Sequence, residues 1–283
     1  MANAPIKDFR EAVGKIENLH GNMAVLSRLG PLLKDPNSDI DDASRLIQSD
    51  SALAASIIRI SNSAFYGGSS QVRDVHSALG KVGFNEALRL VGMALSKQVF
   101  MRDLTTYGIS ADCYWCQSYF LGLFLEETAQ RLGNDVDDAY MVGLLHAIGK
   151  VVLNELIDPA EVEIYWDATY SSEEWEDIMF GIHYNEAGAI LLEKWKFPDS
   201  IHRRVEKQLA SEAIETDSIL ACLAFARDIL MLNAYDFSAR EWTLPEAHPF
   251  YEENEPETVA SEIRRCRSGL EKVRATLKGA AQL

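Results

Sequence analysis

The residues with the clearest chemical potential lie at 143–150, which reads Gly-Leu-Leu-His-Ala-Ile-Gly-Lys. His146 stands on an apolar helical stretch, where it is either a hydrogen-bonded core residue or a residue that contacts a ligand. Lys150 either faces a phosphate group in a pocket or extends from the helix into solvent. Gly143 and Gly149 indicate close helix packing rather than a phosphate cradle, because no Gly-x-Gly-x-x-Gly pattern follows a strand.

Two further groups of side chains could take part in metal or redox chemistry. Cys113 and Cys116 form a Cys-x-x-Cys pair, but no second pair follows at zinc-binding spacing, so packing on a helix is the favoured interpretation. His183, beside Tyr184 and close to Glu186, is either a surface residue or part of a rearranged pocket. The surface position is favoured for this histidine.

The composition limits the environments and partners that the protein can have. The 283 residues include 43 acidic and 27 basic side chains, for a net charge of −16, which argues against general attraction to nucleic acid or an anionic membrane. No apolar run approaches the roughly 20 residues of a membrane-spanning helix, and no apolar segment follows the first basic residues. With only four cysteines, a cytoplasmic protein in a reducing compartment is expected.

Helical periodicity dominates the sequence, and alternating strand patterns are nearly absent, so an all-α fold is predicted. Ser38 is expected to cap a helix, with Asp41 completing a capping box. Gly133 should end a long helix that begins near Asp112. Further helices are predicted at 50–61, 137–156, 173–180, 185–195, 198–209, 215–232 and 257–277.

The best candidate for a domain boundary is 105–111, where Tyr-Gly-Ile-Ser interrupts the helical pattern. It divides the chain into an N-terminal helical bundle, 1–105, and a C-terminal helical bundle, 112–283. Within the second bundle, 243–257 combines prolines with glutamates. This stretch is predicted to form an acidic surface loop.

The segment 143–150 resembles the HD superfamily of metal-dependent phosphohydrolases, in which a His-Asp pair is followed by Ile-Gly-Lys. Upstream, Asp-Ser-Ala-Leu at 50–53, Asn-Ser-Ala-Phe-Tyr-Gly at 62–67 and Ala-Leu-Gly-Lys-Val-Gly at 78–83 resemble the HDOD (HD-related output domain) branch. Together these motifs span about 20–210. The resemblance implies an N-terminal bundle packed on an HD-like helical core, and a role in bacterial signal transduction.

In the middle of the chain, two of the metal ligands that the HD resemblance implies are replaced by other residues. Gln117 stands where the family has its first histidine, and a neutral amide is a poor ligand for a transition metal. His146 keeps the histidine of the His-Asp pair, but Ala147 replaces the aspartate. The carboxylate that holds or bridges the metals in the family is therefore missing.

Departures from the family pattern continue along the second half of the chain. Tyr184 aligns with a further histidine of the family, while His183 lies one place early. Gln208 ends the helix where the family has His-His. The distal aspartate aligns with either Arg227 or Asp228, and the sequence leaves this register open. So few ligands remain that neither a metal nor another cofactor is expected.

The leading functional hypothesis is a non-catalytic HDOD module that regulates a signalling protein by binding it. The groove between the bundles is one candidate surface for that partner. The acidic loop 243–257, with Phe250 and Tyr251 expected to be exposed, is the other.

Two alternative functions stay open at this point. One is a metal-dependent phosphohydrolase with an atypical ligand set, His146, Asp228, His183 and Glu186. The other is a metal-free sensor of a small anionic, nucleotide-like ligand that binds through Lys150, Gln117 and Gln208. Tyr184 and Ala147 would line the remnant pocket in either case.

Overall fold

The computed structural model describes residues 23–63, 66–67, 71–100, 102–157, 165–166, 171–252 and 254–279. Residues 1–22 of the predicted N-terminal bundle, and Ala64 and Phe65 of the HDOD-like motif, lie outside the described residues. Every named element of the described chain is a helix, and one isolated bridge joins Leu104 to Ile109. The all-α prediction is confirmed.

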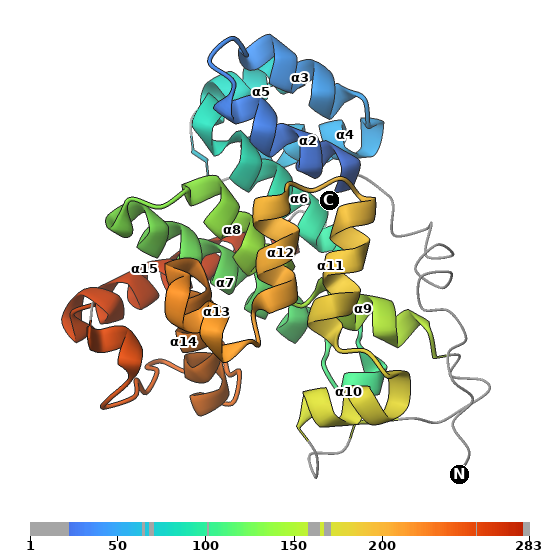
Figure 1. Ribbon diagram of the computed structural model, residues 1–283. Helices are drawn as coiled ribbons and strands as arrows, with labels where there is room; N and C mark the ends of the chain where they lie inside the picture. Colours follow the sequence, from blue (N-terminus) through green and yellow to red (C-terminus); the bar gives the residue numbers. More distant parts are fainter. Residues whose placement is uncertain are drawn as a thin grey trace.

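The first set of helices lies at the top of the view in Figure 1. It comprises α2 (Met23–Lys34), α3 (Ile40–Gln48), α4 (Ser51–Ser61), α5 (Val75–Val82), the 3-10 turn η2 (Phe84–Glu86) and α6 (Ala87–Phe100). The cap of α3 is Asp39, with Asp42 completing the capping box, one residue later than predicted. The reason is that Ser38 still belongs to the preceding turn, where its N–H donates to the carbonyl of Asp35.

The second set of helices contains the rest of the described chain. It comprises η3 (Thr105–Tyr107), α7 (Ala111–Leu132), α8 (Val136–Leu145), α9 (Ile148–Glu155), α10 (Ser172–Phe180), α11 (Tyr184–Lys194), α12 (Asp199–Lys207), α13 (Ser211–Thr216), α14 (Ser218–Leu232), η4 (Pro249–Glu252) and α15 (Pro256–Gly279). Ser110 caps α7, and Gly133 ends it with φ of 72°, a conformation that glycine adopts without steric cost. The predicted end of this helix is confirmed.

The single helix predicted at 137–156 is wrong, because the chain breaks into α8 and α9 at His146 and Ala147. Two carbonyl groups at the break accept side-chain hydrogen bonds. The His146 carbonyl accepts from Gln208 Nε2 at 2.8 Å, and the Ala147 carbonyl accepts from the Tyr114 hydroxyl at 3.0 Å. These donors come from α7 and from the end of α12, so the helical period could not predict them.

The helix predicted at 215–232 is also two helices, α13 and α14. Asp217 separates them, because its backbone is extended and its carboxylate accepts from the N–H groups of Ile219 and Leu220. The sequence pattern missed this cap because the apolar periodicity of α14 begins immediately after it.

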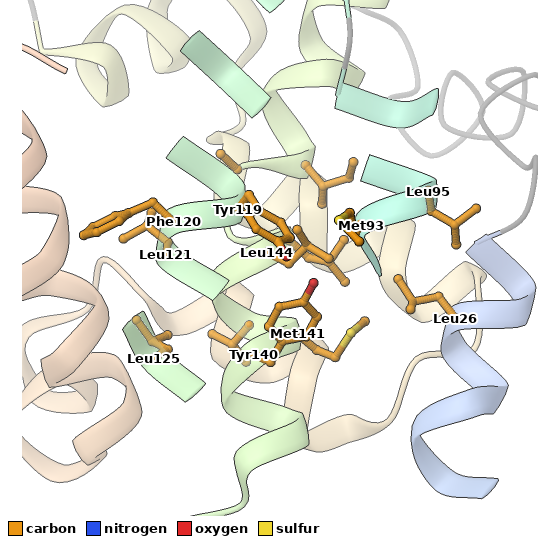
Figure 2. Close-up of a cluster of buried hydrophobic side chains, with 14 of the residues drawn as sticks. Leu26, Met93, Leu95, Tyr119, Phe120, Leu121, Leu125, Tyr140, Met141 and Leu144 are labelled. Atoms are coloured by element: carbon orange, nitrogen blue, oxygen red, sulfur yellow. The ribbon is translucent and has the colours of Figure 1, made fainter. Parts of the chain in front are cut away.

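One buried apolar cluster joins the two sets of helices. Figure 2 shows Tyr119 of α7 and Tyr140 of α8 near Met93 of α6, with Leu26 of α2 at the edge. Gly143 lets α8 approach α7, since a Cβ atom there would lie 2.4 Å from the Leu121 carbonyl oxygen. The chain turns at η3 and Gly108, inside the predicted boundary, while the division into two domains stays a prediction.

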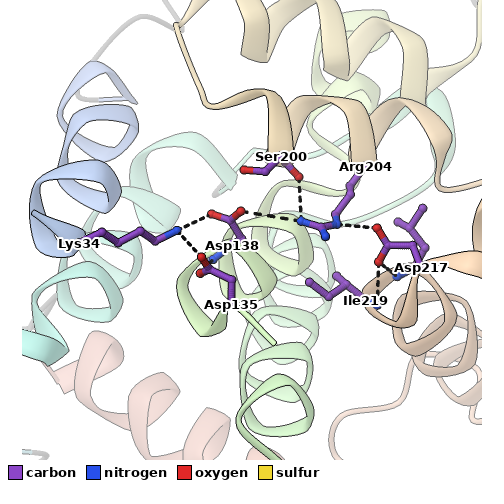
Figure 3. A network of polar contacts seen from close by, with 8 residues as sticks. Lys34, Asp135, Asp138, Ser200, Arg204, Asp217 and Ile219 are labelled. Atoms are coloured by element: carbon purple, nitrogen blue, oxygen red, sulfur yellow. Dashed lines mark hydrogen bonds and ion pairs between the residues drawn. The ribbon is translucent and has the colours of Figure 1, made fainter. Parts of the chain in front are cut away.

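A polar network also crosses between the two sets of helices (Figure 3). Lys34 Nζ of α2 lies 2.7 Å from Asp135 Oδ2 and 2.8 Å from Asp138 Oδ1. Asp138 Oδ2 lies 3.8 Å from Arg204 Nη1, and Arg204 Nε lies 2.7 Å from Asp217 Oδ2. The network therefore ties α2 to α8, α12 and the start of α14.

Within the described part of the chain, none of the helices combines the length and apolar character that a bilayer crossing requires.

Candidate functional site

His146 lies at the break between α8 and α9 and is only 5% exposed. Its Nδ1 atom is 2.8 Å from the Gly143 carbonyl oxygen, so Nδ1 carries the proton, because a carbonyl can only accept. Burial lowers the pKa of His146 to about 3. The imidazole is therefore neutral at physiological pH, which supports the prediction of a hydrogen-bonded core histidine.

Lys150 follows one turn later on α9 and does not extend freely into solvent. Its Nζ atom lies 4.7 Å from the ring centroid of Tyr184 and 5.1 Å from that of Tyr107, distances at which a cation is attracted to an aromatic face. Burial lowers the pKa of this ammonium group, and the charge of Glu176 partly offsets that effect. Lys150 is half-buried, so its side chain lies between the solvated position and the pocket position expected from the sequence.

Glu176 of α10 is the main residue of this site that the sequence analysis missed. Its side chain is fully buried; Oε1 accepts from the Tyr107 hydroxyl and Oε2 from the Tyr184 N–H, both at 2.8 Å. Burial raises the pKa of this carboxyl group, while Lys150 and the two donors lower it. Its surface neighbour Glu174 completes the capping box of α10, but no local pattern marks Glu176 as the buried carboxylate.

Arg227 and Asp228 settle the register that the sequence left open. Asp228 faces outward, with 55% of its side chain exposed, and lies 3.3 Å from His248 Nε2. The side chain of Arg227 is 29% exposed, and its charge contributes to the lowered pKa values of His146 and Lys150. Its guanidinium lies 3.7 Å from Glu173 Oε1. The expectation that Asp228 could be a ligand beside His146 is wrong, because one helical residue rotates a side chain by about 100°.

The other positions of the remnant site are occupied by groups with internal partners. Gln208 is buried, and its Nε2 donates to the carbonyls of His146 and Val205. Gln117 Nε2 lies 3.0 Å from Cys113 Sγ. Ala147 contributes only a methyl group and is 5% exposed. Of these side chains, Gln208 contacts His146, through the carbonyl at the helix break, whereas the amide nitrogen of Gln117 contacts Cys113.

His183 and Glu186 belong to the start of α11 rather than to a pocket around His146. The His183 N–H donates to Glu186 Oε2 at 3.2 Å, and the side chain of Glu186 is exposed. In the described ranges, no three His, Cys, Asp or Glu side chains converge where they could hold a metal ion. The alternative ligand set of His146, Asp228, His183 and Glu186 is therefore not brought together.

The donor set around His146 does not fit a divalent metal. The positions implied by the HD resemblance present two amides, a methyl group and a phenol, and the distal position presents the guanidinium of Arg227. A metal ion near His146 would meet two positive side chains, Lys150 and Arg227, which repel it. The site therefore contains a buried imidazole and the positive side chains of Lys150 and Arg227.

The acidic stretch 243–257 differs from the exposed loop that was predicted. It contains the turn η4, and Phe250 is buried at 7% exposure, with its ring stacked 4.5 Å from that of Phe225. Tyr251 is partly buried and packs edge-on to the same ring at 5.2 Å. The expectation that both aromatic rings are exposed is wrong, because α14 supplies an apolar surface to cover.

Comparison with protein families agrees with the motifs. The sequence matches the HDOD domain over residues 22–210, close to the predicted span of about 20–210 and more than half of the chain. The chain belongs to the HDOD family. The matched region includes the helix break at His146, Lys150 of α9 and Gln208, whereas Arg227 and α14 lie beyond it.

Solved structures share the HDOD fold of this chain. An HDOD domain protein of unknown function from Geobacter sulfurreducens gives a TM-score of 0.59 at 21% identity, covering 91% of this chain and 88% of that chain. A proposed signal transduction protein from Marinobacter aquaeolei VT8 gives a TM-score of 0.67 at 22% identity, covering 92% of this chain and 59% of that chain. At these identities the likeness establishes the fold alone.

A relative from Treponema pallidum (strain Nichols), itself an uncharacterized protein, is 25% identical over 201 residues. The match covers 69% of this chain but 38% of the relative, so the chain spans well under half of that protein's length.

Proposed function

We propose that this HDOD protein is a non-catalytic signalling module that acts by binding a partner protein. The observation that carries the proposal is that no three His, Cys, Asp or Glu side chains among the described residues converge where they could hold a metal ion. A catalytic divalent site needs about three or more protein ligands and an activated water. A guanidinium at the distal position opposes both requirements, and the name of the Marinobacter relative is consistent with signalling.

The experiment that tests this proposal measures metal content and hydrolysis together. Full-length protein is analysed by elemental mass spectrometry and assayed with bis(p-nitrophenyl) phosphate in the presence of Mn²⁺. We expect substoichiometric metal, and a hydrolysis rate that His146→Ala leaves unchanged. His76→Ala, at a half-exposed histidine on α5, is the matched control. Stoichiometric metal that is lost only in His146→Ala, together with hydrolysis, would overturn the proposal.

A second candidate function, the binding of a small anionic ligand, is favoured by the pair Lys150 and Arg227. Both cations influence the neutral His146, and Glu173 is the carboxylate closest to Arg227, at 3.7 Å. This contact is too long for a strong hydrogen bond, so an anionic ligand could replace Glu173 beside the guanidinium. Gln117 and Gln208 contribute less than expected, because their amide groups already have internal partners.

Substitutions of opposite sign test the anionic-ligand candidate, with pyrophosphate as the probe. Arg227→Gln should weaken pyrophosphate binding about tenfold or more, whereas Glu173→Gln should strengthen it by removing the competing carboxylate. Arg203→Gln, at an exposed arginine of α12, is the control. Thermal shift against pyrophosphate concentration reports the binding. A flat response of the wild-type protein, or equal effects of Arg227→Gln and Arg203→Gln, would reject this candidate.

A further inference from the structure

A groove of about 650 Å³ lies between α13, α14 and the turn η4, away from His146. The apolar residues that line it include Ala221 and Ala224 of α14, Ile214 of α13 and Pro249 of η4. Leu132, at the end of α7, lines the groove and is 38% exposed. The size falls within the range of about 300–1,000 Å³ that is typical of binding pockets.

Two of the polar side chains around this groove have partners within the protein. Ser218 Oγ accepts from Asn134 Nδ2 at 2.9 Å. Asn254 Oδ1 accepts from Arg131 at 2.7 Å, and its Nδ2 donates to the Phe250 carbonyl at 2.9 Å. Ser211 and Thr216 also line the groove and are exposed, so the groove offers accessible polar groups beside its apolar residues.

The charge at the groove has one sign. Glu215 and Glu252 line it and are exposed, and they form no ion pair with the described residues. Among its described lining residues there is no lysine or arginine. His248 also lines the groove; its Nδ1 accepts from the Phe250 N–H at 3.0 Å, and its Nε2 lies 3.3 Å from Asp228 Oδ2. Apolar lining residues with an acidic rim, formed by Glu215 and Glu252, are complementary to a basic, amphipathic partner.

We propose that this groove binds a basic amphipathic helix of a partner protein. A helix suits it because the described residues form no strand whose edge could pair with an extended peptide, so recognition must come from side chains. The apolar face of the helix would lie over Ala221 and Ala224, and its lysine or arginine residues would meet Glu215 and Glu252. The inference rests on the proposed function, because it names the surface and the partner chemistry of a binding module.

The test uses the full-length chain and synthetic peptides of about 18 residues, which form about five helical turns. The probe is a fluorescent leucine–lysine peptide with leucines on one helical face. A peptide of the same composition, scrambled to remove that face, is the control for charge. Binding is followed by fluorescence anisotropy in wild-type protein and in two double variants. Glu215→Lys with Glu252→Lys reverses the rim, whereas Glu193→Lys with Glu206→Lys makes the same change in net charge on exposed residues of α11 and α12.

We expect the amphipathic peptide to bind at least about tenfold more tightly than the scrambled one, and the rim variant to lose about tenfold in affinity. The distant double variant should stay within about twofold of wild type. Equal binding of the two peptides, or equal losses in the two variants, would overturn the inference. Circular dichroism melting confirms that both variants are folded. The peptide-binding result does not depend on the metal-content and hydrolysis measurements. Failure of this inference can therefore be distinguished from failure of the proposed function.

Discussion

Gly149→Ala is expected to abolish the folded structure or to destabilise it by more than about 4 kcal/mol. A Cβ atom at Gly149 of α9 would lie 1.8 Å from the carbonyl oxygen of Tyr184 and 2.6 Å from the backbone nitrogen of Gly188. Both neighbours are backbone atoms of α11, so no side-chain rotation can make room for it. The two helices would have to separate, which would open the core beside His146. Urea denaturation followed by circular dichroism measures the loss.

Gly80→Ala is the matched control for this substitution. Gly80 also lies inside a helix, α5, but the nearest neighbour of a Cβ atom there would be Ile40 Cδ1, at an ordinary contact distance of 4.0 Å. Alanine should therefore stabilise the protein by about 0.5–1 kcal/mol, because it restricts the unfolded chain and favours the helix. A Gly149→Ala protein that unfolds at the same urea concentration as wild type would show that α9 and α11 do not approach as closely as described.

Glu176→Leu is expected to lower the free energy of unfolding by about 2–4 kcal/mol, because two donors at this buried carboxylate lose their acceptor. It would leave Lys150 without its neighbouring carboxylate, and the Tyr107 hydroxyl and the Tyr184 N–H without their acceptor. Urea denaturation at about pH 7 measures this loss. Asp177→Leu, at an exposed position on the same helix and outside its capping box, is the control and should change stability by less than about 0.5 kcal/mol.

The double variant Glu176→Leu with Lys150→Met should regain part of that loss, because the isolated charge is gone. The loss of stability caused by Glu176→Leu alone should also be smaller at about pH 9 than at about pH 7. The sign follows from Lys150, whose pKa burial lowers: the unfolded chain then binds more protons, so stability rises with pH. The electrostatic coupling of Glu176 and Lys150 would be refuted by two results together: the stability losses of the two substitutions add in the double variant, and the loss in Glu176→Leu does not change with pH.

Some helix boundaries could be predicted from local sequence signals alone. Gly133 ends α7, and Asp50 caps α4, because these residues act on backbone groups within one turn of their own positions. The break at His146 was missed for the opposite reason. It depends on hydrogen bonds from Tyr114 and Gln208, which are distant in sequence.

The candidate site was partly predictable from the resemblance to the HDOD family. His146, Lys150 and Gln208 were expected near one another, and the hydrogen bond from Gln208 to the His146 carbonyl brings two of them together. Glu176 was not expected, because the partners that distinguish it, Tyr107 and Tyr184, come from other elements.

By itself, the sequence determined the all-α class, most helix positions and the membership of the HDOD family, because helical periodicity, capping residues and motifs are properties of short segments. Only the tertiary structure decided what the site contains. On α14, the side chain of Asp228 is 55% exposed beside His248, whereas that of the neighbouring Arg227 is 29% exposed and lies 3.7 Å from Glu173. The packing of α10 then placed the Glu176 carboxylate beside Lys150. Burial and charge depend on which helices meet, and no local pattern contains that information.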